Sequence, residues 1–102
     1  MSESLDRPVL LSAASNQAVV QLPGRRFPGS VIQGDSLSYL YVLACAVENH
    51  AVDTPNDALI EAARELRELL EGRLRAYDEV LSQNKIERPY KRPMWRNMDA
   101  GE

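Results

Sequence analysis

The stretch "TPNDALIEAARELRELLEGRLRAYDEVLSQ" (Thr54–Gln83) decides the fold, because its apolar residues recur every three or four positions. This spacing is typical of an amphipathic helix. The apolar series is Leu59, Ala63, Leu66, Leu70, Leu74, Tyr77 and Leu81. We expect Thr54 to be the N-cap, Pro55 the first helical residue and Asp57 a favourable charge in the positive first turn. The stretch therefore predicts a helix over residues 54–83.

Charged residues of this helix are spaced for ion pairs along an outer face. The i,i+4 pairs are Arg64 with Glu68, Arg67 with Glu71, and Glu71 with Arg75. Gly72 interrupts the helix at a cost of about 1 kcal/mol relative to alanine. We interpret this glycine as a point where another backbone approaches closely.

A second helix is predicted directly before this one, over residues 35–50. Its apolar stripe consists of Leu37, Leu40, Tyr41, Ala44 and Val47. Asp35 or Ser36 is expected to supply the N-cap, because short polar side chains accept hydrogen bonds from the first free N–H groups. Asn49 and His50 are expected to end the helix.

The segment over residues 8–34 favours β structure. "PVLLS" (8–12), "QAVVQL" (17–22) and "SVIQG" (30–34) are predicted strands, and Ser15 and Asn16 are turn formers between the first two. In "PGRRFPG" (23–29), each Pro-Gly pair predicts a type II turn. We predict an α+β fold in which a small antiparallel sheet of about three strands packs on two antiparallel helices. Residues 1–84 would form one domain and residues 85–102 an extended tail.

Composition limits the class of protein. A chain of 102 residues with 44% hydrophobic residues fits one globular domain, and its net charge of −3 gives no global attraction for nucleic acid. The opening "MSESLDRPVL" lacks the features of a signal peptide, and no apolar run is long enough to span a membrane. With Cys45 as the single cysteine, we expect a cytoplasmic protein with no metal, no cofactor and no membrane association.

The charge is divided unevenly along the chain. Residues 51–83 carry eight acids against four arginines, a net −4, and residues 84–98 carry five bases against Glu87, a net +4. The tail "RPYKRPMWRNM" places Tyr90, Arg92 and Trp95 among these bases. Such a tail is predicted to fold back on the acidic helix, or to bind a protein. The alternative is that its aromatic residues stack on single-stranded nucleic acid.

The loop "PGRRFPG" is a second candidate binding element. Arg25 and Arg26 could hold an anion near a helix N-terminus. The structural interpretation has these arginines paired with the acidic helix and Phe27 anchored in the core. The loop fits no phosphate-loop pattern, so we favour the structural interpretation.

Gly34-Asp35-Ser36-Leu37 spells the motif that names the GDSL esterases and lipases. A nucleophilic serine needs a base within hydrogen-bond reach. The one histidine, His50, lies fourteen residues after Ser36, or about 21 Å along a helix. We therefore expect Ser36 to be a helix-start residue and the protein not to be an enzyme, with a minor serine hydrolase at Ser36 as an alternative.

The segment "SNQAVVQLPGRRFPGSVIQGDSLSYL" (15–40) resembles a family of small uncharacterised bacterial proteins. In that family a strand, an L-P-x-R-x-F-P-G turn and a Q-G-D-S/T-L helix start follow one another. The resemblance implies a bacterial cytoplasmic protein of about one domain, with no established activity.

We predict a non-catalytic protein-binding module acting through the helix over 54–83 and the tail, with a homodimer through that helix. An antidote or immunity-type protein, or a regulator, is the more specific form, because small acidic domains suit basic partners. The alternative is a nucleic-acid-binding regulator using Arg25, Arg26 and the tail. The candidate binding residues are Arg25, Arg26, Phe27, Tyr90, Arg92 and Trp95.

Overall fold

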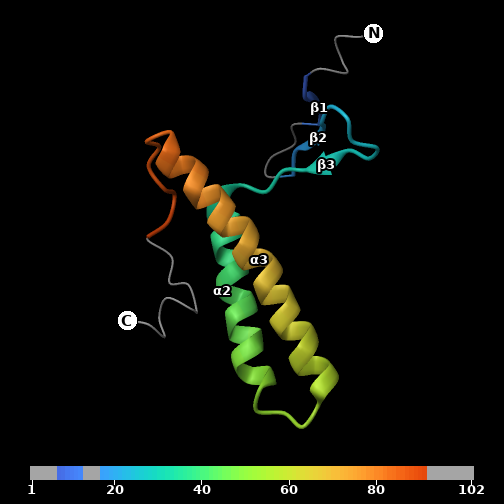
Figure 1. Cartoon of the computed structure of the whole chain (residues 1–102), viewed down its shortest axis with the longest axis vertical. Helices are drawn as coiled ribbons and strands as arrows, with labels where there is room; N and C mark the ends of the chain where they lie inside the picture. Colours follow the sequence, from blue (N-terminus) through green and yellow to red (C-terminus); the bar gives the residue numbers. More distant parts are fainter. Residues whose placement is uncertain (1–6, 13–16, 92–102) are drawn as a thin grey trace. The chain divides into compact units, whose positions relative to one another are not determined.

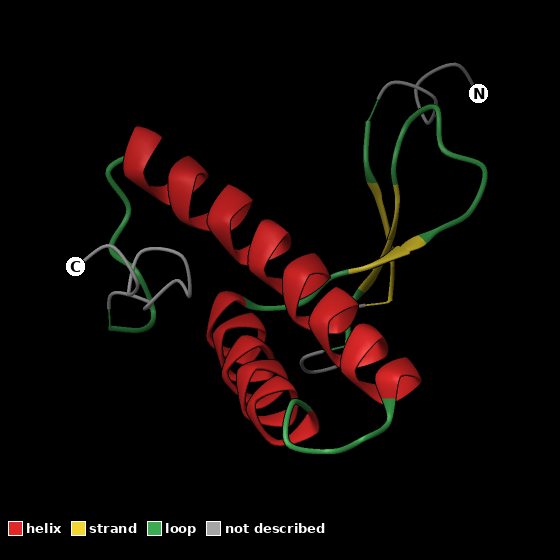
Figure 2. Ribbon diagram, turned by 60° about the horizontal axis from the view of Figure 1, so that its bottom comes forward, coloured by secondary structure: helices red, strands yellow, loops and turns green. Residues whose placement is uncertain are grey.

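The protein has an α+β fold, seen in a computed structural model that describes residues 7–12 and 17–91. Three strands come first and two helices follow (Figures 1 and 2). The chain divides into two compact units, one ending at Gln33 and the other beginning at Gly34. The fold class is therefore confirmed, whereas the packing of the sheet on the helices stays a prediction.

The first unit contains a three-stranded antiparallel sheet in the order β1-β2-β3. β1 runs over Val9–Ser12, β2 over Val19–Gln21 and β3 over Gly29–Ser30. Leu10 pairs with Val20, and the register between β1 and β2 becomes irregular between Leu10 and Ser12. None of the described residues before Gly34 is fully buried. The described part of this unit is therefore a hydrogen-bonded sheet without a closed apolar core of its own.

The third strand and its turn differ from the sequence prediction. β3 is two residues long and begins at Gly29, so residues 31–34 are not a strand. Gly24 has a positive φ of 74°, as a type II turn at Pro23-Gly24 requires. Gly29 lies in β3 and pairs with Val20, so the second predicted turn is absent.

The second unit is an antiparallel pair of helices, α2 over Gly34–Ala51 and α3 over Asp57–Gln83 (Figure 1). The buried residues of α2 recur at alternating steps of three and four: Gly34, Leu37, Tyr41, Ala44, Glu48 and Ala51. Those steps are typical of the a and d positions of a coiled coil. The corresponding positions of α3 are Ile60, Ala63, Arg67, Leu70, Leu74, Tyr77 and Leu81. We call these two series together the seam.

The centre of the seam is a cluster of Leu37, Tyr41 and Leu74, of which Leu74 is completely buried. Cys45, Leu70, Tyr77 and Tyr90 pack around this cluster. Cys45 is thus a half-buried free cysteine beside the core.

The predicted apolar stripes are correct in part. On α3, Ala63, Leu74 and Leu81 are buried, but Leu59 and Leu66 are exposed. On α2, Leu40 and Val47 are exposed in the same way. Two charged residues, Glu48 and Arg67, occupy buried seam positions instead. The buried side of each helix therefore differs from the stripe that hydrophobicity alone predicts.

The helix ends were also predicted only in part. The N-cap of α3 is Asn56, whose side-chain oxygen accepts a hydrogen bond from Leu59 N at 3.0 Å. Thr54, the predicted cap, instead donates its hydroxyl to the carbonyl of Ala51 at the end of α2. α2 begins at Gly34, one residue before the predicted start, and Asp35 Oδ1 accepts a hydrogen bond from Ser36 N at 2.8 Å.

Candidate functional site

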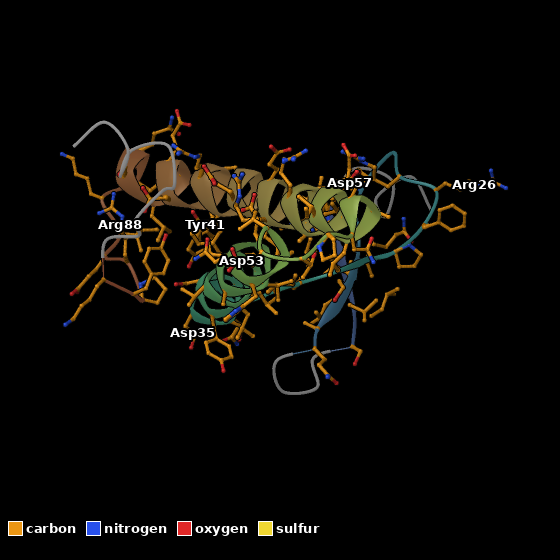
Figure 3. The ribbon with its side chains drawn as sticks, turned by 90° about the horizontal axis from the view of Figure 1, so that it is seen from below. Arg26, Asp35, Tyr41, Asp53, Asp57 and Arg88 are labelled. Carbon is orange, nitrogen blue, oxygen red and sulfur yellow. The ribbon has the colours of Figure 1, made fainter. Side chains whose placement is uncertain are left out.

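Four charged side chains, three buried and one half-buried, form a network between the two helices, which we call the buried network. Arg67 of α3 donates from Nε to Glu48 Oε1 of α2 at 2.8 Å and from a terminal nitrogen to Glu71 Oε1 at 2.9 Å. Arg75 donates from Nε to Glu71 Oε2 at 2.9 Å. Tyr41 donates its hydroxyl to Glu71 Oε1 at 3.3 Å, and Figure 3 shows this side chain between the helices. The network contains two carboxylates and two guanidiniums, so its formal charge is balanced.

The electrostatics of the network favour the charged forms. The hydrogen bond to Glu48 raises the pKa of Arg67 above its usual range. Burial acts to raise the pKa of Glu71, but hydrogen bonds from Arg75 and Arg67 outweigh it and hold that pKa below its usual value. No buried side-chain nitrogen or oxygen among the described residues lacks a hydrogen-bond partner.

The network corrects one sequence interpretation. The Arg67–Glu71 and Glu71–Arg75 pairs exist, but Arg67 lies in the seam and Glu71 is buried beside it, so neither lies on the outer face. A polar pair at a seam position specifies helix register, because any slip would leave a buried charge without its partner. The network is therefore a structural device that fixes how α2 and α3 meet.

One side of the helix pair is apolar and open. It consists of Leu40, Leu43 and Val47 of α2 together with Leu59, Leu66, Leu69 and Val80 of α3, and we call it the open face. Each of these residues directly precedes a seam position, which places them on one side of an antiparallel pair. Their side chains are 39 to 67% exposed. At the end near the helix connection, Leu43, Val47 and Leu59 line an open groove of about 350 Å³ whose other walls include His50 and Thr54.

The other side of the helix pair is charged. Arg64 and Glu61 form an ion pair there at 3.6 Å, and Glu68 lies 3.8 Å from a terminal nitrogen of Arg67. A polar groove on this side is lined by two arginines and two glutamates, Arg67, Glu68, Glu71 and Arg75, around Gly72. Because carboxylates already pair with both arginines, this groove offers no free cationic group for an anion.

The loop after β2 exposes the first three predicted binding residues. Gln21 Nε2 donates to the carbonyl of Arg25 at 2.8 Å and stabilises the turn. Arg26 lies 5.3 Å from the centre of the Phe27 ring and extends away from its loop (Figure 3). Phe27 is 71% exposed, so its predicted role as a core anchor is wrong. The loop instead presents an aromatic ring and two guanidiniums to the solvent.

The beginning of the tail folds back on the end of α3. Arg88 forms a two-pronged ion pair with Asp78 and also donates to Ser82 Oγ at 2.9 Å. Tyr90 donates to Asp78 Oδ1 at 3.0 Å, and its ring lies 6.4 Å from that of Tyr77. Burial and this hydrogen bond raise the pKa of Tyr90 to about 12. Two further predicted binding residues, Arg92 and Trp95, lie outside the described residues.

The serine of the GDSL sequence and the histidine lie at opposite ends of α2. Ser36 lies in the first turn of α2, and His50 lies in its last turn, where it lines the apolar groove. Within residues 7–12 and 17–91, no three His, Cys, Asp or Glu side chains lie close enough together to hold a metal ion. The helices that these residues form are also too short or too polar to cross a membrane.

These features define a small α+β protein with a register-locked helix pair and an open apolar face. Residues 6–90 match a family described as "Family of unknown function (DUF6959)", and the chain belongs to this family. No curated protein and no solved structure matches the chain.

Sequence reasoning missed the open face. It predicted two ion pairs of the buried network, but it missed Glu48 and the burial of the pairs. The signal for the open face was present in the steps from Leu59 to Leu66 and from Leu66 to Leu69, which are seven and three residues. The signal for the network was weaker, because Glu48 and Arg67 are nineteen residues apart and only the antiparallel pairing brings them together.

Proposed function

We propose that this protein is a non-catalytic protein-binding module whose binding surface is the open face. The observation that carries the proposal is the set of seven large apolar side chains that lie exposed on one side of the helix pair. Contiguous apolar patches of this kind are uncommon on monomeric soluble proteins and are typical of interaction sites. A groove between two helices suits an amphipathic helix, which places its apolar face in such a groove.

The buried network supports this proposal in a second way. Glu48, Arg67 and Glu71 hold the two helices in one register, so the open face is formed before a partner arrives. A preformed surface loses less conformational entropy on binding than one that must be ordered. A bacterial cytoplasmic setting and an antidote or regulatory role are part of the proposal. The setting is supported by the resemblance of residues 15–40 to small bacterial proteins and by the single cysteine. The antidote or regulatory role is supported by the acidic helical unit, in which residues 34–91 carry eleven acids against seven bases.

Photo-cross-linking in cells tests the proposal directly. p-Benzoylphenylalanine at position 69 of the full-length chain should give a covalent protein adduct, whereas the same group at Val42 should not. Val42 is also exposed and apolar, but it lies one position after the seam residue Tyr41, away from the open face. The adduct at position 69 should disappear in a Val47→Glu background, because a charge in the groove disfavours an apolar partner. No adduct at position 69 would argue against protein binding.

Nucleic-acid binding is a second candidate function. It is favoured by the loop after β2, because the described residues before Gly34 carry three arginines and no acid. Exposed arginines beside an aromatic ring suit a single-stranded ligand. Fluorescence anisotropy with single-stranded DNA and RNA at two salt concentrations tests it. Binding that weakens steeply with salt and is lost in Arg25→Glu/Arg26→Glu would support this candidate.

A further inference from the structure

The open face repeats the geometry of the buried seam. On α3, a second series steps by three and four residues and is exposed throughout: Leu59, Ala62, Leu66, Leu69, Arg73, Ala76 and Val80. A two-helix pair needs only one such seam. Helices with a second seam on a neighbouring side are typical of bundles of more than two helices, where each helix contacts two others.

We infer that the open face is covered by the same face of a second copy of this chain, so that two helix pairs form a four-helix bundle. The inference rests on the proposed protein-binding function and names the partner of that surface. A two-fold axis brings one patch against itself, and such closed dimers are the commonest soluble assemblies. Antiparallel helix pairs with short connections are the usual building units of four-helix bundles.

The size of the open face suits such a dimer. Seven leucines and valines that are each about half exposed present roughly 600 Å² of apolar surface, and stable interfaces bury roughly 800 Å² on each partner. The small residues Ala62 and Ala76 lie between the larger ones and allow close approach of another helix. The open face could therefore supply most of the surface area that each partner buries in a stable interface.

Charge supports a self-complementary arrangement. Arg73 is the one charged residue in the second series, and it forms no ion pair with any described residue. Glu65, next to Leu66, is likewise without an ion pair in the described part of the chain. In a dimer, the rim of the interface would therefore contain both positive Arg73 side chains and negative Glu65 side chains. Complementary rim charges favour the correct partner more than they add affinity.

Sedimentation equilibrium of the purified full-length chain tests the inference. Between about 5 and 300 µM, the wild-type protein should sediment as a monomer and dimer of the 11.4 kDa chain in equilibrium, mostly dimer at the upper concentration, with a dissociation constant in the micromolar range. Leu69→Glu should raise that constant about 30-fold or more. Val42→Glu is the matched control, because it places the same charge on an exposed apolar site away from the open face. It should change the constant less than about threefold.

A second measurement covers the case in which Leu69→Glu disturbs folding. p-Benzoylphenylalanine at position 69 of the otherwise unchanged purified protein should give a covalent dimer on irradiation. Peptide mapping should place the attachment on α2 or α3 residues of the open face. A monomer at about 300 µM without covalent dimer would overturn the inference. If position 69 still gave an adduct with a different protein in cells, only the identity of the partner would be wrong. If no adduct formed in cells either, the proposed function would fail as well.

Discussion

At the residue scale, the two glycines of the helix pair have opposite surroundings. A Cβ at Gly34 would overlap the ring of Tyr77, whereas one at Gly72 would meet no atom within 4 Å, so the predicted close approach of a backbone at Gly72 is wrong. We predict that Gly34→Ala destabilises the fold by about 1–3 kcal/mol, because the ring must leave its packed position. Gly72→Ala should stabilise it by about 0.5–1 kcal/mol, because the backbone gains helix propensity without a clash. Urea unfolding followed by circular dichroism measures both, and a destabilising Gly72→Ala would contradict the open surroundings of Gly72.

Tyr90 gives a second prediction at the same scale. Its pKa is raised to about 12 in the folded protein, from an ordinary value of 10.0. A group whose folded pKa is raised contributes stability that is present below its unfolded pKa and is lost as pH rises through the folded one. Stability should therefore fall between pH 10 and 12, and Tyr90→Phe should remove that part of the fall. Ultraviolet titration of the phenolates should show a late-ionising tyrosine in the wild type that is missing from Tyr90→Phe, and the same late ionisation in both proteins would contradict the contact with Asp78.

Residue-scale features were the least predictable from the sequence. Thr54 and Asn56 are both good N-cap residues, and only the path of the connection from α2 decides between them. In this connection, Thr54 donates a hydrogen bond to the last residue of α2, and Asn56 is the N-cap of α3. Likewise, Gly24 and Gly29 stand in identical Pro-Gly pairs, yet pairing with β2 places Gly29 in a strand.

At the scale of elements, the buried network should dominate the stability of the helix pair. Arg67→Met leaves Glu48 buried without its guanidinium partner, and we predict a loss of about 3–5 kcal/mol. Glu48→Leu/Arg67→Met removes both charges and should recover much of that loss, because an apolar pair of similar volume needs no partner. Thermal and urea unfolding of the three proteins test this. A double variant as unstable as Arg67→Met would mean that Glu48 is not an unpaired buried charge in the single variant.

Glu71 makes the helix pair sensitive to acid. Its pKa lies below the ordinary value of 4.5, so its contribution to stability is present above that pH. The contribution is lost as pH falls through the folded pKa, because protonation removes the hydrogen bonds from Arg67 and Arg75. We predict that the unfolding free energy of the wild type falls more steeply below pH 4.5 than that of Glu71→Gln. Equal slopes would mean that other carboxylates govern the acid response.

The elements themselves were predictable because their periodicity is strong. Both helices and the three strands exist in the expected order, and the helix bounds agree within three residues. The buried side of α3 was predicted only in part, because hydrophobicity counts Leu59 and Leu66 as core and Arg67 as surface. Arg67 occupies a seam position because carboxylates on both helices bind it. The hydrophobic pattern of α3 contains no information about the carboxylate on α2.

At the scale of the whole molecule, the chain joins two units of unequal construction. The helical unit has a closed seam with Leu74 fully buried, whereas the described residues before Gly34 include none that is buried. The sequence predicts this difference poorly. The strands contain valines and leucines that suit a core, but two of them, Leu10 and Leu11, are exposed. Short strands of two to four residues leave little room for a buried side, which a pattern of β propensity does not reveal.

Amide hydrogen exchange should reveal this inequality. Exchange is slow where opening requires disruption of a packed core and fast where few apolar contacts hold a segment. We predict that the slowest amides lie in α2 and α3 near Tyr41 and Leu74, and that amides of β1, β2 and β3 exchange much faster. Leu74→Ala should cost about 2–5 kcal/mol and should speed exchange throughout both helices. Sheet amides as slow as those beside Leu74 would contradict this prediction, because such protection requires a buried core that the described residues before Gly34 do not provide.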